Sequence, residues 1–190
     1  MRSIIINKNI VAALLAALVV TVIGSAYAAE TRKIMWDDLI PEGWNPEKIF
    51  QDLTDEEFNA LPEETYQAML KQVQAELDAA PVTESLNGER LKIPGFIVPL
   101  EINNTNISEF LLVPYFGACT HTPPPPANQI IYSKAKNQFS IDDIYQPVWI
   151  TGTLQTGRYT SQLNEAGVAQ AADIKSAYSM QVEVVEPYEE

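Results

Sequence analysis

The spacing of apolar residues changes at about residue 91, and this change is the strongest constraint on the fold. Before it, apolar side chains recur every three or four positions, as on one face of a helix. After it, they fall into five short runs separated by turn-forming segments, as expected of strands. The runs cover residues 91–101, 109–116, 128–135, 147–155 and 177–185. The chain is therefore expected to be mainly β, with a helical appendage.

The runs also carry marks of bending. In the last run Tyr178, Met180, Val182 and Val184 alternate with polar residues, which predicts one buried face and one wet face. Gly95 and Gly152 interrupt two other runs, where a side chain would hinder a bend or a close approach. Pro94 and Pro99 cannot donate ladder hydrogen bonds, so the first run should be bulged or partly at an edge. Five short strands with such bends favour a small antiparallel barrel, OB-like in type, and a β-sandwich is the alternative.

Two helices are expected before the strands. Thr54 and Glu57 form a capping box, which predicts a short helix ending near Ala60. A second helix should run from Pro62 to about Ala79 and end at Pro81, with one apolar face. The apolar positions of that face are Tyr66, Met69, Leu70, Val73 and Leu77. Residues 29–50 should be irregular and tied down by aromatic anchors, and residues 156–176 should form a loop with a short helix near Glu165 to Ile174.

The first 28 residues have the pattern of a cleavable export signal. Arg2 and Lys8 precede an apolar run of about 14 residues, too short to span a bilayer, and small residues at Ala26 and Ala28 suit a cleavage site. We therefore expect cleavage after Ala28 and a periplasmic protein without a later membrane span. The expected organisation is a signal peptide at 1–28, an irregular and helical appendage at 29–80, and the β-barrel domain at 81–190.

Charge and cysteine content exclude several classes of protein. The chain has 12 Lys and Arg against 25 Asp and Glu, and loss of the two basic residues of the signal would leave a net charge of −15. Such acidity disfavours nucleic acid and anionic lipid as partners. Cys119 is the only cysteine, so a small fold stapled by intramolecular disulfides is excluded.

The segment best suited to binding or catalysis contains both the only Cys and the only His of the chain. Cys119 and His121 are two residues apart, so on an extended backbone their side chains point the same way. Pro123 to Pro126 follow directly and favour a stiff polyproline II stretch. Residues that could complete or support a site here are Asn128, Gln129, Glu101, Asp142 and Asp143.

Three interpretations of this pair remain open. Thiolate and imidazole are ligands that zinc and copper prefer, which suggests a metal site. Alternatively, His121 could activate Cys119 as a nucleophile, although two parallel side chains suit shared coordination better than proton transfer. The third interpretation is structural, with Cys119 buried as a small apolar residue and His121 bonded to the backbone.

Several strings resemble a family of exported bacterial proteins known as a conserved domain of unknown function. They are Ile93 to Glu101, Phe110 to Cys119, the Cys-x-His-x-Pro-Pro-Pro-Pro-x-Asn-Gln motif ending at Gln129, Trp36 to Pro41, Trp149 to Gly152, and Ser176 to Met180. The resemblance implies a periplasmic location and an association with envelope ABC transporters and zinc-linked exported proteins. It implies no established activity.

The sequence and the resemblance together favour a periplasmic binding or accessory protein. Its expected role is transition-metal handling, of zinc or copper, for an envelope transporter, with Cys119 and His121 as ligands. A metal-free adaptor that docks another protein is the alternative, and a Cys/His-dependent enzyme is a further one. The chain is expected to be non-enzymatic rather than catalytic.

Overall fold

The computed structural model describes residues 31–46, 48, 53–103, 106–118, 124–140, 143, 145–162 and 173–189. All of these belong to one compact unit, Thr31–Glu190. Among them, no helix combines the length and the hydropathy that a membrane span requires. The expected signal peptide and its cleavage site lie outside the described residues.

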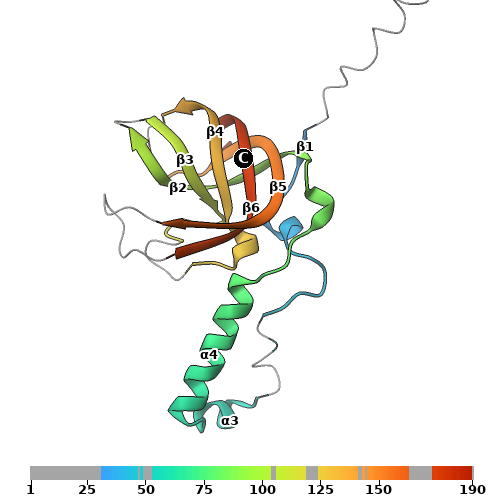
Figure 1. The fold of residues 1–190 in the computed structure, drawn as a ribbon, viewed down its shortest axis with the longest axis vertical. Coiled ribbons are helices and arrows are strands. Elements are labelled where there is room, and N and C mark those ends of the chain that lie inside the picture. Colours follow the sequence, from blue (N-terminus) through green and yellow to red (C-terminus); the bar gives the residue numbers. More distant parts are fainter. Residues whose placement is uncertain are drawn as a thin grey trace, which may run out of the picture. The chain divides into compact units, whose positions relative to one another are not determined.

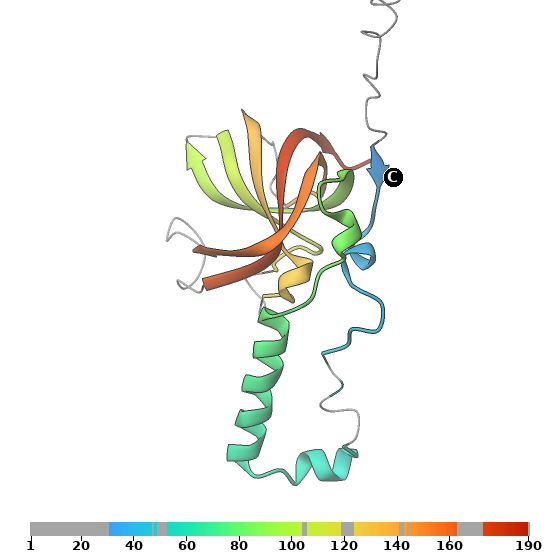
Figure 2. The same ribbon diagram turned by 45° about the vertical axis from the view of Figure 1, so that its right-hand side comes forward.

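Five strands pair in a closed ring, which is the main feature of the fold (Figures 1 and 2). They are β2 (Arg90–Asn103), β3 (Asn106–Val113), β4 (Ile131–Phe139), β5 (Val148–Gln162) and β6 (Asp173–Pro187). Pairing follows the order β2, β3, β4, β6, β5, and β5 pairs again with β2. These strands correspond to the five predicted runs. The pairing forms one ring rather than the two separate sheets of a sandwich.

β2 closes the ring because its two halves pair with different strands. Residues 90–95 pair with β5, and residues 96–103 pair with β3. The register of β2 against β3 shifts between Pro99 and Ile102, so the predicted bulge near Pro99 is confirmed. A bulge bends its strand and increases the local twist, which helps a single strand to turn from one neighbour to the next.

The prediction of a wholly antiparallel set of strands is wrong in one pair. β4 and β6 run parallel, with Ile131 opposite Tyr178 and Ala135 opposite Val182. A parallel pair needs a long connection, and the antiparallel strand β5 lies between β4 and β6 in the sequence. A sixth strand of two residues, β1 (Arg32–Lys33), also pairs parallel with β2. The alternation of apolar and polar residues does not specify which strands pair. It therefore could not predict that β4 runs parallel to β6 or that β1 runs parallel to β2.

The N-terminal part matches the expected mixture of irregular chain and helices. The 3₁₀ helix η1 (Trp36–Leu39) follows β1, then come α3 (Asp55–Asn59), α4 (Glu63–Asp78) and the 3₁₀ helix η2 (Glu84–Leu86). The Thr54 hydroxyl accepts a hydrogen bond from the Glu57 amide, and the Glu57 carboxylate accepts one from the Thr54 amide. The predicted capping box and both predicted helices are therefore confirmed.

Two clusters of buried apolar residues lie on the two faces of the curved sheet. The larger includes Ile93, Phe110, Ile150, Leu154 and Tyr178. The smaller includes Val98, Leu111, Ile130 and Ile174. Because strand side chains alternate between faces, neighbours such as Phe110 and Leu111 enter different clusters.

Two boundaries differ from prediction, both in the hairpin of β5 and β6. β5 continues to Gln162, and β6 begins at Asp173, opposite Gln162. The prediction of a short helix near Glu165 to Ile174 is wrong at its C-terminal end, because Ile174 lies in β6 and is buried. The rest of that predicted helix lies outside the described residues. Polar residues after Gln155 favoured a loop, but their main chains pair with β6 regardless of side-chain polarity.

Candidate functional site

The residues of the predicted metal site are mostly outside the described part of the chain. Cys119, His121 and Asp142 are not described, and of Glu101 only the backbone position in β2 is. Among the described residues, no three His, Cys, Asp or Glu side chains form a group that could hold a metal ion. The proposed pairing of Cys119 with His121 thus stays a prediction.

Asn128 and Gln129 fasten the N-terminal part of the chain to the ring. Both belong to the 3₁₀ helix η3 (Ala127–Gln129). The side-chain amide of Asn128 donates to the Pro81 carbonyl at 2.9 Å, and that of Gln129 donates to the Trp36 carbonyl at 3.0 Å. Trp36 in turn donates from its indole nitrogen to the Pro94 carbonyl at 2.7 Å. These contacts give the amide nitrogens of Asn128 and Gln129 a structural role, and their predicted part in supporting a site stays a prediction.

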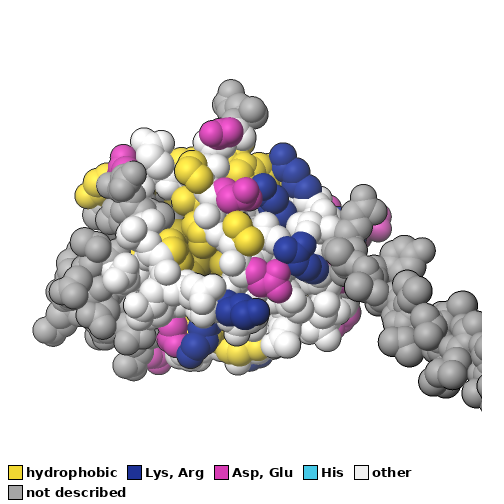
Figure 3. Space-filling view, turned by 90° about the horizontal axis from the view of Figure 1, so that it is seen from above, with side chains coloured by type: hydrophobic (Ala, Val, Ile, Leu, Met, Phe, Trp, Pro, Cys, Tyr) yellow, Lys and Arg dark blue, Asp and Glu magenta, His cyan; other side chains and the backbone are white. Residues whose placement is uncertain are grey.

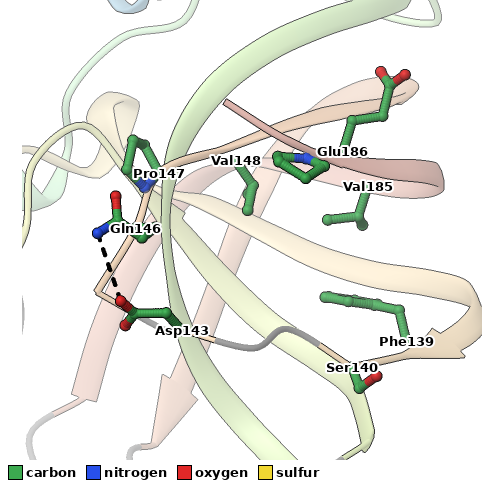
Figure 4. A pocket seen from close by; sticks show the side chains of 9 residues that line it. Phe139, Ser140, Asp143, Gln146, Pro147, Val148, Val185 and Glu186 are labelled. Carbon is green, nitrogen blue, oxygen red and sulfur yellow. Dashed lines mark hydrogen bonds between the residues drawn. The ribbon is translucent and has the colours of Figure 1, made fainter. Parts of the chain in front are cut away.

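A cavity of about 300 Å³ opens where β4 and β6 end and β5 begins (Figure 4). Phe139, Val148 and Val185 come from these three strands and supply much of its apolar wall. The remaining lining residues are Ser140, Asp143, Gln146, Pro147, Glu186 and Pro187. An apolar hollow with a few polar groups is the usual form of a small-ligand site.

A bulge in β6 builds one wall of this cavity. Thr151 pairs with Val184, but the next residue, Gly152, pairs with Val182, so Glu183 is the extra residue. The bulge reverses the alternation after it. Val185 therefore packs against the core and lines the cavity, while Val184 is 42% exposed. The prediction that Val184 lies on the buried face is wrong for this reason.

Gly152 makes the bulge sterically feasible. A Cβ atom at this position would lie 2.2 Å from the Gln181 carbonyl oxygen and 2.9 Å from the Val182 Cα. Both are backbone atoms, which cannot rotate away as a side chain can. The prediction that Gly152 marks a close approach is confirmed.

Asp143 is the predicted supporting residue that does line the cavity. Its Oδ1 accepts a hydrogen bond from the Tyr145 backbone amide at 2.8 Å, and its Oδ2 lies 3.5 Å from Nε2 of the Gln146 side chain. The second contact is at the limit of a hydrogen bond. The carboxylate can therefore accept further bonds from a ligand.

A second hollow adjoins the cavity, because Glu186 and Pro187 line both. It measures about 500 Å³ and is also lined by Lys33, Lys92 and Trp149. The Lys33 ammonium lies 4.1 Å from the centre of the Trp149 ring, and Lys92 forms a 2.6 Å ion pair with Glu186. Figure 3, a view from above, shows apolar side chains near the centre with Lys, Arg, Asp and Glu beside them.

The groups with shifted pKa values have structural causes and do not line either hollow. Hydrogen bonds from Thr54 lower the pKa of Glu57. Hydrogen bonds from Lys134 and Tyr132 lower the pKa of Glu109. Burial raises the pKa of Tyr178. Among the described residues, these shifts mark a helix cap, a cross-strand pair and a buried hydroxyl.

Sequence reasoning identified only Asp143 among the residues that line the cavity. Phe139, Gln146 and Glu186 belong to segments that meet only when β6 pairs with both β4 and β5. One signal was available: Val184 and Val185 are adjacent apolar residues in a run that otherwise alternates, and such a break is typical of a bulge.

Comparison with known proteins identifies a family without assigning an activity. The family described as "Protein of unknown function (DUF3299)" matches residues 36–187. A crystal structure of a DUF3299 family protein from Pseudomonas aeruginosa PAO1 is 36% identical, with a TM-score of 0.61 over 84% of this chain and 97% of that chain. No curated protein is significantly similar to the chain. The predicted resemblance is confirmed as far as the family: the chain belongs to the DUF3299 family of proteins of unknown function.

Proposed function

We propose that this protein is an exported binding protein whose ligand site is the cavity at the end of the ring. The cavity carries the proposal, because it combines an apolar wall from three strands with the carboxylate of Asp143 at its edge. Pockets of this size and composition hold small ligands or single side chains. The proposed role is binding and not catalysis.

The lining favours a ligand with an apolar body and a cationic end. Phe139, Val148 and Val185 offer apolar contact, while the Asp143 carboxylate accepts hydrogen bonds. Glu186 is already paired with Lys92, so Asp143 is the stronger candidate to meet a cation. The net charge of −13 adds a long-range attraction for cations.

The fold proposed for this function is a small OB-like barrel. The cyclic pairing of β2, β3, β4, β6 and β5 supports it, with β4 and β6 running parallel. An OB-fold is a five-stranded, partly open barrel. The cavity would then lie at one end of the barrel, where β4 and β6 end.

Benzylamine is a suitable probe because it joins an aromatic ring to a cation, and phenylacetate is its anionic counterpart. In NMR titrations of the purified protein, we expect benzylamine to shift the amide signals of Phe139, Val148 and Val185 more than phenylacetate does. Val185→Phe should fill the cavity and abolish these shifts. Val184→Phe is the matched control, since Val184 is exposed and outside the cavity.

Two results would contradict the cavity proposal. One is a lack of saturable shifts with benzylamine. The other is equal binding by the Val185→Phe variant and the unaltered protein. In a third variant, Asp143→Asn, we expect benzylamine to lose its advantage over phenylacetate, because the cation loses its partner.

Transition-metal handling is a second proposal, supported by a sequence observation. The only Cys and the only His are two residues apart, as two ligands of one zinc or copper ion would be. The reduced protein should retain about one equivalent of metal, as measured by mass spectrometry of metal content. Cys119→Ser and His121→Ala should each weaken that retention, whereas Val185→Phe should not. Equal retention in all variants would contradict the proposal.

We also propose that the protein is exported and that it serves an envelope transporter. The signal pattern of residues 1–28 supports export, and N-terminal sequencing of the protein from the periplasm should begin at Ala29. A first residue upstream of Ala29 would show a retained leader. The transporter partner is supported by the family resemblance, and co-purification after cross-linking in the envelope tests it.

A further inference from the structure

The helices α3 and α4 form a hairpin, and among the described residues no other element buries the apolar face of α4. Five apolar side chains lie on this face: Tyr66, Met69, Leu70, Val73 and Leu77. None of the five is buried: Leu70 is 38% exposed, and the other four are partly exposed. In an ordinary surface helix such a stripe faces the core. The hairpin does not line the proposed ligand cavity.

The hairpin is nevertheless well stabilised in itself. The capping box of Thr54 and Glu57 begins α3, and the rings of Phe58 and Tyr66 pack edge to face with centres 5.8 Å apart. The Arg158 guanidinium donates to the Asp78 and Ala79 carbonyls and so holds the C-terminal end of α4 to β5. These contacts support the start of α3, the packing of α3 on α4 and the end of α4.

The charge of the hairpin selects its partner. Residues 54–79 carry seven acidic side chains and a single basic one, Lys71. Glu63, Glu76 and Asp78 accept hydrogen bonds from neutral glutamines, which leave their charges uncompensated. Glu63 lies seven residues before Leu70 and Glu76 three residues after Val73, so carboxylates border the apolar stripe on both sides.

We infer that the α3–α4 hairpin is a docking surface for a partner protein that presents an apolar strip bordered by lysine or arginine. An amphipathic helix in such a partner would bury the stripe and pair with the bordering carboxylates. A second copy of this hairpin would place like charges opposite each other, and an anionic lipid surface would do the same. The match to DUF3299 spans the hairpin, so this surface is part of the family's domain.

A synthetic amphipathic peptide can stand in for the partner strip. The probe is an 18-residue peptide with leucines at helical spacing and lysines elsewhere, and its counterpart has glutamates in place of the lysines. Fluorescence anisotropy should show binding of the lysine peptide alone, with weakening as salt screens the charges. Equal binding of the glutamate peptide, or no binding of the lysine peptide, would overturn the inference.

Matched double variants distinguish docking on the stripe from general attraction to an acidic protein. Met69→Gln with Val73→Gln changes the stripe, and Ala68→Gln with Ala75→Gln places two glutamines on the opposite face. Glutamine favours helix, so both variants should keep their helical circular dichroism. The first should weaken peptide binding at least tenfold, and the second by less than twofold. Equal affinities for the two variants would contradict docking on the stripe.

A third variant tests the charges and does not depend on the apolar substitutions. Glu63→Gln with Glu76→Gln should weaken binding severalfold and flatten its salt dependence, because two bordering carboxylates are neutralised. An unchanged salt dependence would overturn the assigned partner chemistry. Sedimentation of the protein alone checks the competing occupant: a dimer that the Met69→Gln, Val73→Gln variant dissociates would show that a second copy covers the stripe.

Discussion

Tyr178 is one residue that joins three parts of the chain far apart in sequence. Its hydroxyl accepts a hydrogen bond from the Thr83 amide at 2.6 Å and donates one to the Leu39 carbonyl at 2.8 Å. The side chain is fully buried in β6. A single oxygen atom therefore links the N-terminal segment, the approach to β2 and the last strand.

Replacing Tyr178 with Phe should lower the free energy of unfolding by about 1–3 kcal/mol, because a buried amide and a buried carbonyl lose their partner. Urea denaturation at pH 7 measures the loss. Tyr188→Phe is the control, since Tyr188 is partly exposed and its ring stacks on Trp149 without needing the hydroxyl. Equal stability of the two variants would show that the Tyr178 hydroxyl contributes little.

The same hydroxyl should make stability sensitive to alkali. Burial raises the pKa of Tyr178 above its ordinary value of 10.0. The unfolded chain therefore releases this proton at a lower pH than the folded chain does, and stability falls as pH rises above about 10. Denaturation midpoints between pH 8 and pH 11 should fall more steeply in the unaltered protein than in Tyr178→Phe. Parallel curves would argue against this origin of the pH dependence.

At the scale of elements, Gly152 controls how β5 and β6 pair. Gly152→Ala should destabilise the protein by about 3 kcal/mol or more, because its Cβ would collide with backbone atoms of β6 and overpacking of this kind is costly. Gly157→Ala is the control in the same strand, since its Cβ would meet only the Tyr159 side chain, which can move. Thermal unfolding followed by circular dichroism should separate the two variants clearly.

The pair of Glu109 and Lys134 joins β3 to β4. The two residues lie directly opposite each other, with their charged atoms 2.7 Å apart. Lys134 is largely exposed, so Glu109→Gln should cost only about 0.5 kcal/mol at pH 7.

The contribution of Glu109 should depend on pH in a defined direction. Hydrogen bonds from Lys134 and Tyr132 hold the pKa of Glu109 below its ordinary value of 4.5. The stabilisation is present above pH 4.5 and is lost as pH falls through the lowered pKa. The stabilities of Glu109→Gln and the unaltered protein, measured by urea denaturation, should therefore converge in acid. A constant difference down to pH 2 would assign the effect to something other than this charge.

Local sequence predicted the elements better than their partners. The capping box of Thr54 and Glu57 involves four consecutive residues, so the start of α3 could be predicted from sequence alone. Strand positions followed from alternation, and Gly152 marked a close approach. The parallel pairing of β4 with β6 and the extension of β5 to Gln162 depend on main-chain contacts between distant segments, which side-chain patterns do not encode.

For the same reason, the sequence predicted only one residue of the candidate site. Asp143 was identified from its charge, whereas Phe139, Val148 and Val185 meet only through the pairing of β6 with β4 and β5 and through the bulge in β6. Asn128 and Gln129 were predicted as possible supporting residues from their place in an unusual motif, and the sequence did not indicate that their side chains also donate to the backbone of Pro81 and Trp36. Such long-range backbone contacts leave no trace in sequence spacing.

At the scale of the whole molecule, the net negative charge should destabilise the folded state. The net charge is −13, and the ion pairs among the described residues are few and exposed. Repulsion between carboxylates disfavours the folded chain, and salt screens it. The urea midpoint should therefore rise between 20 and 300 mM sodium chloride. Sodium chloride is preferable to sulfate, which stabilises proteins by exclusion from their surface, and a falling midpoint would show that attractive pairs dominate.

The pairing of β2 with β5 also sets the order in which the protein can mature. During synthesis β2, β3 and β4 emerge first, but they form only an open sheet, because β5 and β6 supply the link from β4 back to β2. A chain cut short before Val148 would keep two unpaired strand edges, which promote aggregation. The closed ring therefore requires synthesis through β6, and a product truncated before Val148 should be prone to aggregate.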